Sequence, residues 1–570
     1  MKDEGCRRQA VVSGQWAVDS KTLQEADPFI LHPSSFILHP SSFILHPSSL
    51  FLAVVLTAVL APQSGCRRPS PSPNPVGSEG PEAEHMRRSE VFNYAVGTLF
   101  NYVEYDSAEV LQQAVGRLDQ WVQAQEPLAD WKLDPLVATL PNPLSELPAM
   151  LKPEQLEFPR SDALAFRETV WLRDVSTWAR GDAVDELDQA RELFDWTARN
   201  VQLDGVPAAE GTQAPSRVLQ KPWETLLFGR GTATDRAWLF ILLARQQGID
   251  AALLALVDPD DTARARLRPW VVAVLSQGEL YLFDPTLGMP IPAPGGVTRG
   301  PAGALDLRPA TLAQVAQSDA LLRQLDVEEY RYPVESSQVQ SVVVLLEASP
   351  TYLAQRMKLV ENQLASGERL VLTTDPSGQA KQFQACRHVV DVRLWALPYQ
   401  TLVQERQLGP NRQQWQQAQL LPFMAATGSF PALWKGRQYH LKGIFTGEQS
   451  AATYYQTARP PERLLNTAPL DPGLKQTLAR AKLDASYWLG LIAAQQGNHE
   501  AAVDWLATRT LEAAPDGPWT WGARYNLGRV YEALGQIAKA IESYRADSGS
   551  PASHGNLLRA RWLQQGKDEG

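Results

Sequence analysis

Residues 229–249 read GRGTATDRAWLFILLARQQGI, and this stretch decides the fold. A glycine turn leads into Thr232, Thr234 and Asp235, whose side-chain oxygens can accept hydrogen bonds from the free N–H groups of a first helical turn. An apolar run follows, and Gly248 stands where the end of a helix favours a positive φ. The stretch therefore predicts a buried helix that ends just before Gly248.

Strands are predicted on the C-terminal side of this helix. Residues 249–257 are apolar enough for a buried strand, and residues 269–275 and 279–283 form two more strands joined by a short turn at 276–278. Asp284-Pro285-Thr286 then ends the hairpin with a turn. On the N-terminal side, residues 188–200 carry an apolar stripe at helical spacing.

Two short motifs in this region are similar to the signatures of a known family. Gly231-Thr-Ala-Thr-Asp-Arg-Ala237 stands where the family has Gly-x-Cys-x-Asp-x-Ala, and Arg268-Pro-Trp270 followed by Asp284-Pro-Thr286 stands where it has His-x-Trp and Asp-Pro-Thr. The chain thus resembles the transglutaminase-like superfamily, a branch of the papain-type cysteine peptidase fold. The resemblance implies an α+β fold, with a helix packed on an antiparallel sheet, for residues 181–304.

The resemblance also implies where a Cys-His-Asp triad would stand, and two of its three residues differ here. Ala233 occupies the nucleophile position, Arg268 the base position, and only Asp284 is kept. A methyl group cannot attack a carbonyl, and a guanidinium cannot accept a proton at neutral pH. The residues therefore predict a pseudoenzyme with no catalytic residue. We also expect Arg268 and Asp284 to form an ion pair in place of the lost His-Asp hydrogen bond.

An enzyme remains the alternative. Thr232 or Thr234 could attack if a histidine distant in sequence folded into the site, which would make the chain a cysteine-independent peptidase or acyl transferase. No cysteine lies between Cys66 and Cys386, and no histidine between His85 and His388. Helix capping explains both threonines without any chemistry.

A repeat near the C-terminus gives an independent signal. It resembles the tetratricopeptide repeat family, which implies helix pairs that stack into an array over residues 431–570. The implied partner is a protein or peptide bound on the array surface; a structural support for the middle of the chain is the other interpretation. The agreeing positions are Leu489, Gly490, Ala493, Gly497, Ala502 and Leu506 in one copy and Leu527, Gly528, Tyr531, Gly535, Ala540 and Tyr544 in the next, with Leu558, Trp562 and Gly566 as a cap.

The first 87 residues are unlike the rest of the chain. Residues 1–49 are low-complexity sequence with FILHPSS three times, and residues 50–66 have the apolar run of an export signal. Ser-Gly-Cys66 resembles the end of a bacterial lipoprotein signal, which implies lipidation of Cys66. A plain secretory signal or a misassigned start is the alternative. Residues 67–87 are predicted to be a disordered linker, so we expect an exported chain, tethered to a membrane of a bacterial cell envelope.

Composition excludes several classes of function. The 53 basic and 63 acidic residues give a net charge of -10, which argues against a nucleic-acid partner. Three separated cysteines and eight scattered histidines predict no metal site and no cofactor. Residues 88–180 are predicted to be a helical region and residues 305–430 a mixed α/β region with strands at 341–346, 370–374 and 389–397. We therefore predict a non-catalytic binding or scaffold protein.

Overall fold

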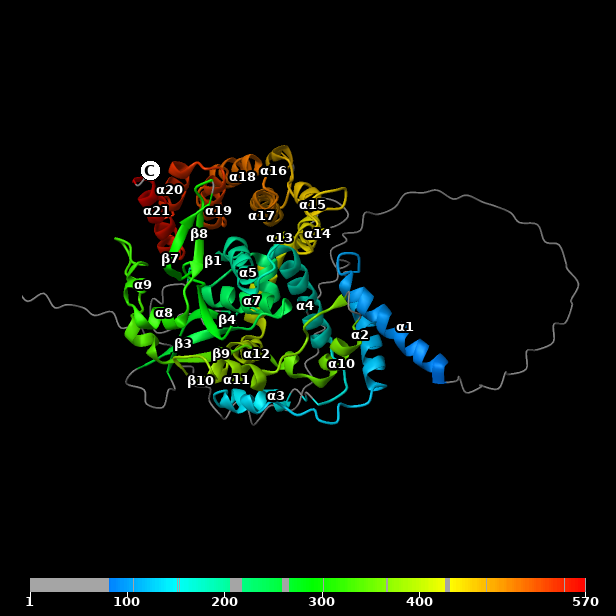
Figure 1. Cartoon of the computed structure of the whole chain (residues 1–570). Helices are drawn as coiled ribbons and strands as arrows, with labels where there is room; N and C mark the ends of the chain where they lie inside the picture. The colour runs from blue at the N-terminus through cyan, green and yellow to red at the C-terminus, as the bar shows by residue number, and fades with distance from the viewer. Residues whose placement is uncertain are drawn as a thin grey trace, which may run out of the picture.

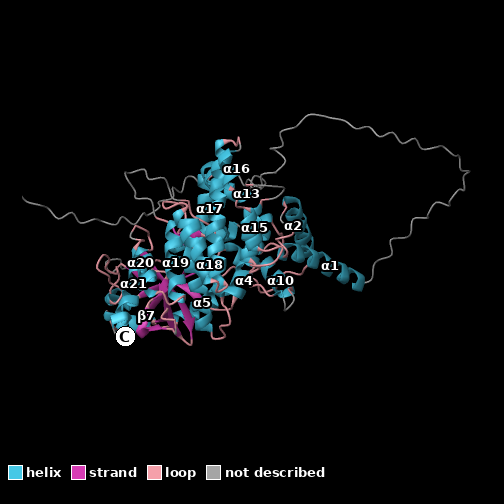
Figure 2. Ribbon diagram, turned by 90° about the horizontal axis from the view of Figure 1, so that it is seen from above, coloured by secondary structure: helices cyan, strands magenta, loops and turns pink. Residues whose placement is uncertain are grey.

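The computed structural model describes residues 81–568 apart from 106, 151, 153, 206–217, 259–265, 301, 365–367, 426–430, 468 and 548. The predicted low-complexity segment, the export signal and Cys66 lie outside the described residues. Figures 1 and 2 show many helices around one central sheet. The α+β class predicted from the sequence is confirmed.

The helices that precede the sheet contribute much of the core. Ser107 caps the second of them and Asp185 the fifth, each by accepting a hydrogen bond from a backbone N–H of the first turn. The first helix begins at Pro81, inside the segment predicted as linker. The bounds are α1 (Pro81–Phe100), α2 (Ala108–Gln123), α3 (Leu147–Met150), α4 (Arg160–Ala179), α5 (Glu186–Asn200), α6 (Pro222–Phe228) and α7 (Ala233–Gln246).

The central sheet has six strands in the order β10-β9-β3-β4-β5-β6. All neighbours are antiparallel except β10 and β9, which are parallel. Two of the strands come from residues beyond 305, so the sheet crosses the predicted boundary at 304. The bounds are β3 (Ala251–Val257), β4 (Leu267–Ser276), β5 (Glu279–Asp284), β6 (Met289–Pro290), β9 (Val342–Leu346) and β10 (Val389–Leu394).

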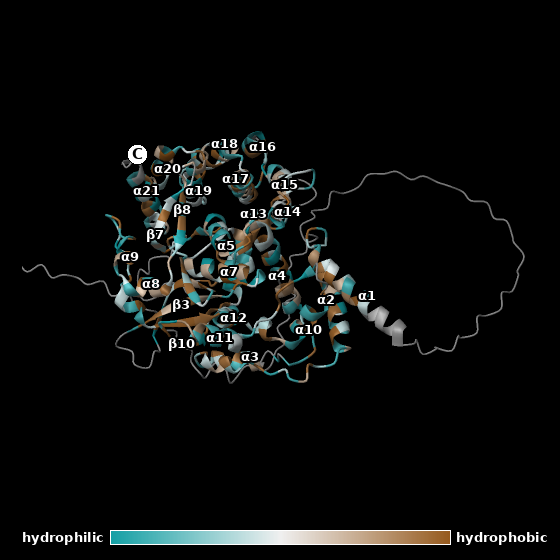
Figure 3. Ribbon diagram, viewed as in Figure 1, coloured by the Kyte–Doolittle hydropathy of each residue, from teal (hydrophilic) through white to brown (hydrophobic). Residues whose placement is uncertain are grey.

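Alternating residues of the sheet fill two cores. Leu253 and Ala255 of β3 pack in the core that also contains α7, whereas Ala252 and Leu254 pack in the core on the opposite face. Both faces are therefore covered, and Figure 3 shows the apolar character of β3. α7 is apolar on nearly all sides because it is buried among α4, α5, α6 and β3.

The rest of the chain before the array adds further helices and short strands. The strand predicted at 370–374 is wrong: no strand forms there, because side chains bind its backbone N–H groups. The Glu361 carboxylate accepts from Leu372 and Thr373 at 2.7 and 2.9 Å, which replaces a strand partner. The bounds are β1 (Gln202–Leu203), β2 (Arg230–Gly231), β7 (Pro292–Arg299), β8 (Leu305–Pro309), α8 (Leu312–Gln317), α9 (Ala320–Arg323), α10 (Gln355–Gln363), α11 (Pro376–Gln384), α12 (Leu397–Leu408) and α13 (Pro410–Met424).

The C-terminal residues form the predicted pairs of helices. Gly497 and Gly535 have positive φ values of 72° and 69° at equivalent turns between the paired helices. In the pair that contains Gly497, the second helix continues as a π-helical segment from Asp504 to Glu512. The bounds are α14 (Ala432–Leu441), α15 (Ala451–Thr457), α16 (Glu462–Thr467), α17 (Pro472–Gln495), α18 (His499–Val503), the π-helical segment η9 (Asp504–Glu512), α19 (Thr520–Ala533), α20 (Ile537–Arg545) and α21 (Ser553–Asp568).

Among the described residues, no helix has both the length and the apolar character that crossing a bilayer requires.

Candidate functional site

The start of α7 is held by a reciprocal pair of caps. The Thr232 hydroxyl accepts from the Asp235 N–H at 3.3 Å, and the Asp235 carboxylate accepts from the Thr232 N–H at 2.8 Å. The same carboxylate accepts from the Thr232 hydroxyl at 2.8 Å. Ala233 is the first residue of α7 and is half-buried. Its methyl group therefore stands where the helix dipole would favour a negative charge.

Arg236 joins the first turn of α7 to two other segments. Its guanidinium donates to the carbonyls of Val201 and Ala198 at 2.8 and 3.0 Å, and to the carbonyl of Pro285 at 3.1 Å. The end of α5 and the turn after β5 are thus fixed beside the start of α7. Burial lowers the pKa of Arg236 to about 10. Arg236 was not singled out from the sequence, because an arginine inside an apolar helix gives no sign of its partners.

Asp284 is buried at the end of β5, and its two carboxylate oxygens accept hydrogen bonds from the following turn and from one distant tyrosine. Its Oδ1 accepts from the N–H groups of Thr286 and Leu287 at 2.8 and 3.0 Å, and its Oδ2 accepts from the Tyr332 hydroxyl at 2.7 Å. The indole of Trp270 donates to the same hydroxyl at 2.8 Å. Burial raises the pKa of Asp284, and burial beside Asp284 raises the pKa of Tyr332 well above its ordinary value. Sequence reasoning missed Tyr332, which lies in no motif.

Arg268 lies on β4 opposite Leu256, with an exposed side chain. The expected ion pair is wrong: within the described parts of the chain, no ion pair joins Arg268 to Asp284. The reason is that Tyr332 and the turn N–H groups already occupy both oxygens of Asp284. Arg268 is near enough to Tyr332 for its charge to act on that hydroxyl.

One histidine of the array lies near the turn after β5. His554, in α21, stacks on Tyr330 with ring centroids 5.3 Å apart, and its Nε2 lies 2.7 Å from the Leu325 carbonyl. Its charge acts on Asp284, so the fold brings one distant histidine towards the turn after β5. Within the described residues, neither Thr232 nor Thr234 has a hydrogen bond to a histidine. His554 was missed from the sequence because it lies far from Asp284 along the chain. Only the packing of the array brings it near the turn after β5.

The described residues contain no group of three or more His, Cys, Asp or Glu side chains arranged to hold a metal ion. Cys386 is a free and buried thiol, and burial raises its pKa. A thiol in that state is a poor nucleophile.

The array packs directly on the sheet-bearing part of the chain. Gln202 of β1 donates to the Pro518 carbonyl at 2.9 Å and accepts from the Gly522 N–H at 2.7 Å. Asn526 donates to the carbonyl of Arg199 at 3.0 Å. Further along, the Glu532 carboxylate accepts from the N–H of Leu305 at 3.0 Å. The α19 face is thereby joined to α5, β1 and β8, which lie beside it in Figure 1.

Comparison with known families agrees with this architecture. The family model of the transglutaminase-like superfamily matches residues 174–285, from the end of α4 to the turn after β5. That of the tetratricopeptide repeat matches residues 522–546, which span α19 and α20. No curated protein and no solved structure matches the chain. The chain thus contains a transglutaminase-like domain and, near its C-terminus, a tetratricopeptide repeat.

Proposed function

We propose that this chain is an exported, membrane-tethered, non-catalytic binding or scaffold protein of a bacterial cell envelope. Its transglutaminase-like domain serves as a framework, and its tetratricopeptide array offers a surface to a protein or peptide partner. The observation that carries the proposal is the alanine at the first position of α7, because the family places its thiol there.

The residues around the Ala233 position support the proposal that the domain is non-catalytic. A thiolate nucleophile needs an imidazole beside it and a carboxylate that orients the imidazole. In this chain the Tyr332 hydroxyl donates to Asp284 at 2.7 Å, which takes up the oxygen that an imidazole would need. Arg268 cannot act as a base, since a guanidinium keeps its proton at neutral pH. The hydroxyl of Thr232 is committed to Asp235 as a cap.

The packing of the array supports a binding role for its outer side. One face of α19 packs against α5 and β1 through Gln202 and Asn526. That face is therefore covered by the rest of the chain, and a partner would bind elsewhere on the array. The helices η9 and α20 carry charged side chains at the surface, among them Arg509 of η9, whose guanidinium lies 4.5 Å from the ring centroid of the half-buried Trp505. Tetratricopeptide arrays present extended surfaces of this kind to partners.

Export and tethering are supported by the sequence alone, through the apolar run before Ser-Gly-Cys66. Cell fractionation of the expressed chain tests both. We expect the chain in the membrane fraction and the Cys66→Ser variant in the soluble periplasmic or extracellular fraction. Cys6→Ser is the matched control and should stay with the membrane. Equal fractionation of the native chain and the Cys66→Ser variant would overturn the tether.

A second experiment tests the emptied site. In the Ala233→Cys variant, the helix N-terminus should lower the thiol pKa below about 8.5, the ordinary value. Alkylation by iodoacetamide, mapped to residue 233 by mass spectrometry at several pH values, measures this pKa. The native Cys386, which is buried, is the internal reference in the same sample. If the introduced thiol stays unreactive at pH 9, residue 233 is not at an accessible helix start.

A further inference from the structure

The last helix, α21, joins the end of the array to the sheet-bearing part of the chain. The Ser553 hydroxyl donates to the Tyr330 hydroxyl at 2.9 Å, and Nε2 of His554 lies 2.7 Å from the Leu325 carbonyl. These contacts connect the start of α21 to the loop that follows α9.

The later turns of α21 are bound in the same way. The Arg561 guanidinium donates to the carbonyls of Gln324 and Asp326, which belong to the same loop. Arg299, the last residue of β7, donates to the Trp562 carbonyl at 2.9 Å. The helix therefore has partners outside the array from its first residue to Trp562.

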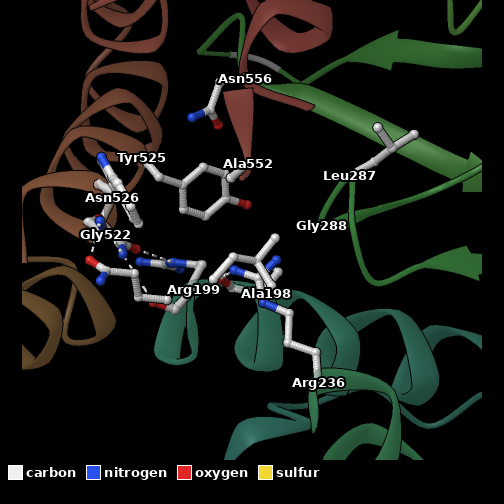
Figure 4. Close-up of a pocket in the computed structure, with 13 residues that line it drawn as sticks. Ala198, Arg199, Arg236, Leu287, Gly288, Gly522, Tyr525, Asn526, Ala552 and Asn556 are labelled. Atoms are coloured by element: carbon white, nitrogen blue, oxygen red, sulfur yellow. Dashed lines mark hydrogen bonds between the residues drawn. The ribbon is translucent and has the colours of Figure 1, made fainter. Parts of the chain in front are cut away.

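The start of α21 also packs closely on the turn after β5. A side chain at Gly555 would collide with the carbonyl oxygen of Leu287. Figure 4 shows Asn556, near the start of α21, together with Leu287 and Gly288 of that turn. The cavity that these residues line has a volume of about 10 Å³, room for about one water molecule. α21 therefore docks on the domain with almost no space between them.

The turn before α21 contains a carboxylate that is removed from water. Asp547 is 1% exposed, and its Oδ2 accepts from the Ser550 hydroxyl at 2.5 Å and from the Asn556 amide at 2.6 Å. Its Oδ1 is buried and has no hydrogen-bond partner among the described residues. Asp547 therefore ties the turn to the first part of α21 with only one of its two oxygens satisfied.

Little positive charge compensates this carboxylate. Within the described chain, Arg524 of α19 is the charged group that acts on Asp547, whereas α21 faces it with the neutral amide of Asn556 and the turn with the hydroxyl of Ser550. Burial raises the pKa of Asp547 to about 6, and the two hydrogen bonds and Arg524 oppose the rise. Because a buried charge with one bare oxygen is costly, the docked turn favours the neutral carboxyl group.

We propose that Asp547 makes the docking of α21 dependent on pH, so that α21 is held on the domain in acid and is released more readily at neutral pH. In acid the neutral carboxyl group leaves no buried charge in the turn. Once the proton is lost, opening of the turn lets water reach the bare oxygen, which favours the undocked state. The inference rests neither on the proposed loss of catalysis nor on a partner of the array.

The direction of the effect follows from where the proton is held more tightly. In an undocked chain the exposed carboxyl group of Asp547 has its ordinary pKa of 3.8, whereas the docked chain keeps the proton up to about pH 6. The contribution to docking is therefore fully present below pH 3.8 and is lost as the pH rises through about 6. Between pH 5 and pH 7.5 the docking equilibrium should weaken about tenfold.

Hydrogen exchange of the full chain, followed by mass spectrometry at pH 5 and pH 7.5 and corrected for the chemical exchange rate, tests the proposal. The rise in α21 exchange should be about tenfold larger in the native chain than in Asp547→Asn, which keeps the neutral state at both pH values. His554, the other titratable group at the docked face, is the same in both chains, so their difference belongs to Asp547. Exchange in α2, which packs on α1 and α4, should not differ between them. An equal rise of α21 exchange in both chains would overturn the proposal.

Two further variants locate the effect. Asp516→Asn changes an exposed aspartate in another turn of the array and should keep the native rise. Ser550→Ala removes a donor to the Asp547 carboxylate, so the midpoint of the rise should move to higher pH, which gives a second test if Asp547→Asn does not fold. An unmoved midpoint in Ser550→Ala, or loss of the rise in Asp516→Asn, would show that Asp547 is not the group responsible.

Discussion

Gly528 of α19 lies against the ring of Tyr544 of α20: a Cβ atom at Gly528 would stand 2.5 Å from Cε1 of that ring. Gly490 has the same relation to Leu506 in the preceding pair of helices, with 2.7 Å to a methyl carbon. Gly436 of α14 has it to Tyr455 of α15, again at 2.5 Å. The absence of a side chain at these glycines lets paired helices touch, which is the role that the repeat gives to small residues.

This contact predicts that Gly528→Ala destabilises the fold by about 1–3 kcal/mol, because the added methyl group overpacks a buried ring. Chemical denaturation followed by circular dichroism measures the change. Gly116→Ala in α2 is the control: a Cβ there meets nothing within 4 Å, so the variant should be neutral or slightly more stable. Equal stability of the two variants would contradict the close contact.

The Tyr332 hydroxyl supports Asp284, so Tyr332→Phe should destabilise the fold by about 1–3 kcal/mol. The change leaves a buried carboxylate oxygen without its donor, and the indole N–H of Trp270 without its acceptor. Tyr281→Phe, a variant on β5 whose ring is half-buried, is the control and should change stability much less. Thermal unfolding of both variants measures the difference, and an unperturbed Tyr332→Phe would show that Asp284 does not depend on this hydroxyl.

Docking of the array depends on Gln202, whose amide bridges the Pro518 carbonyl and the Gly522 N–H. Gln202→Ala should raise hydrogen exchange in α19 and α20 by about thirtyfold, because two buried hydrogen bonds of about 1 kcal/mol each are lost at the interface. Gln417→Ala, an exposed glutamine of α13, should leave exchange unchanged. If hydrogen exchange in α19 and α20 were the same in Gln202→Ala as in Gln417→Ala, the docking of the array through Gln202 would be contradicted.

Stability should also depend on Glu168, whose pKa burial raises to about 7, with Glu347 and Glu224 adding to the effect while the Trp223 N–H and Lys221 oppose it. Because the folded chain holds this proton more tightly than the unfolded chain, the group's contribution is present below pH 4.5 and is lost as the pH rises to about 7.

Glu168→Gln should therefore flatten the fall in unfolding free energy between pH 4.5 and 7, and should be more stable than the native chain at pH 8 by about 1–3 kcal/mol. Urea denaturation at each pH measures the slope. The exposed Glu126→Gln is the control and should keep the native slope. A steeper fall in Glu168→Gln than in the native chain would reverse the sign and contradict the assignment.

Sequence reasoning succeeded where local chemistry decides the structure. Thr232 and Asp235 cap α7 as their side chains predict, and the turn at 276–278 forms the expected hairpin, with Gln277 and Gly278 at φ values of 52° and 79°. The buried strand expected at 249–257 and the glycines of the repeats could be predicted for the same reason. These signals lie within a few residues of the structure that they predict.

Contacts between distant segments could not be predicted in this way. Tyr332 reaches Asp284 across 48 positions, and Gln202 reaches Gly522 across 320. The strand expected at 370–374 failed because Glu361 binds its N–H groups, and the Arg268–Asp284 pair failed because Tyr332 took the carboxylate. Each outcome depends on a side chain whose own sequence context carries no signal for its partner.

The most direct test of the account is turnover by the native chain in a hydroxamate-forming assay with peptide amide substrates. The account predicts no product above buffer for the native chain, with Thr234→Ala and Asp284→Asn equally inactive. Activity confined to the Ala233→Cys, Arg268→His double variant would agree with it. Turnover by the native chain that disappears in Thr234→Ala or Asp284→Asn would contradict it.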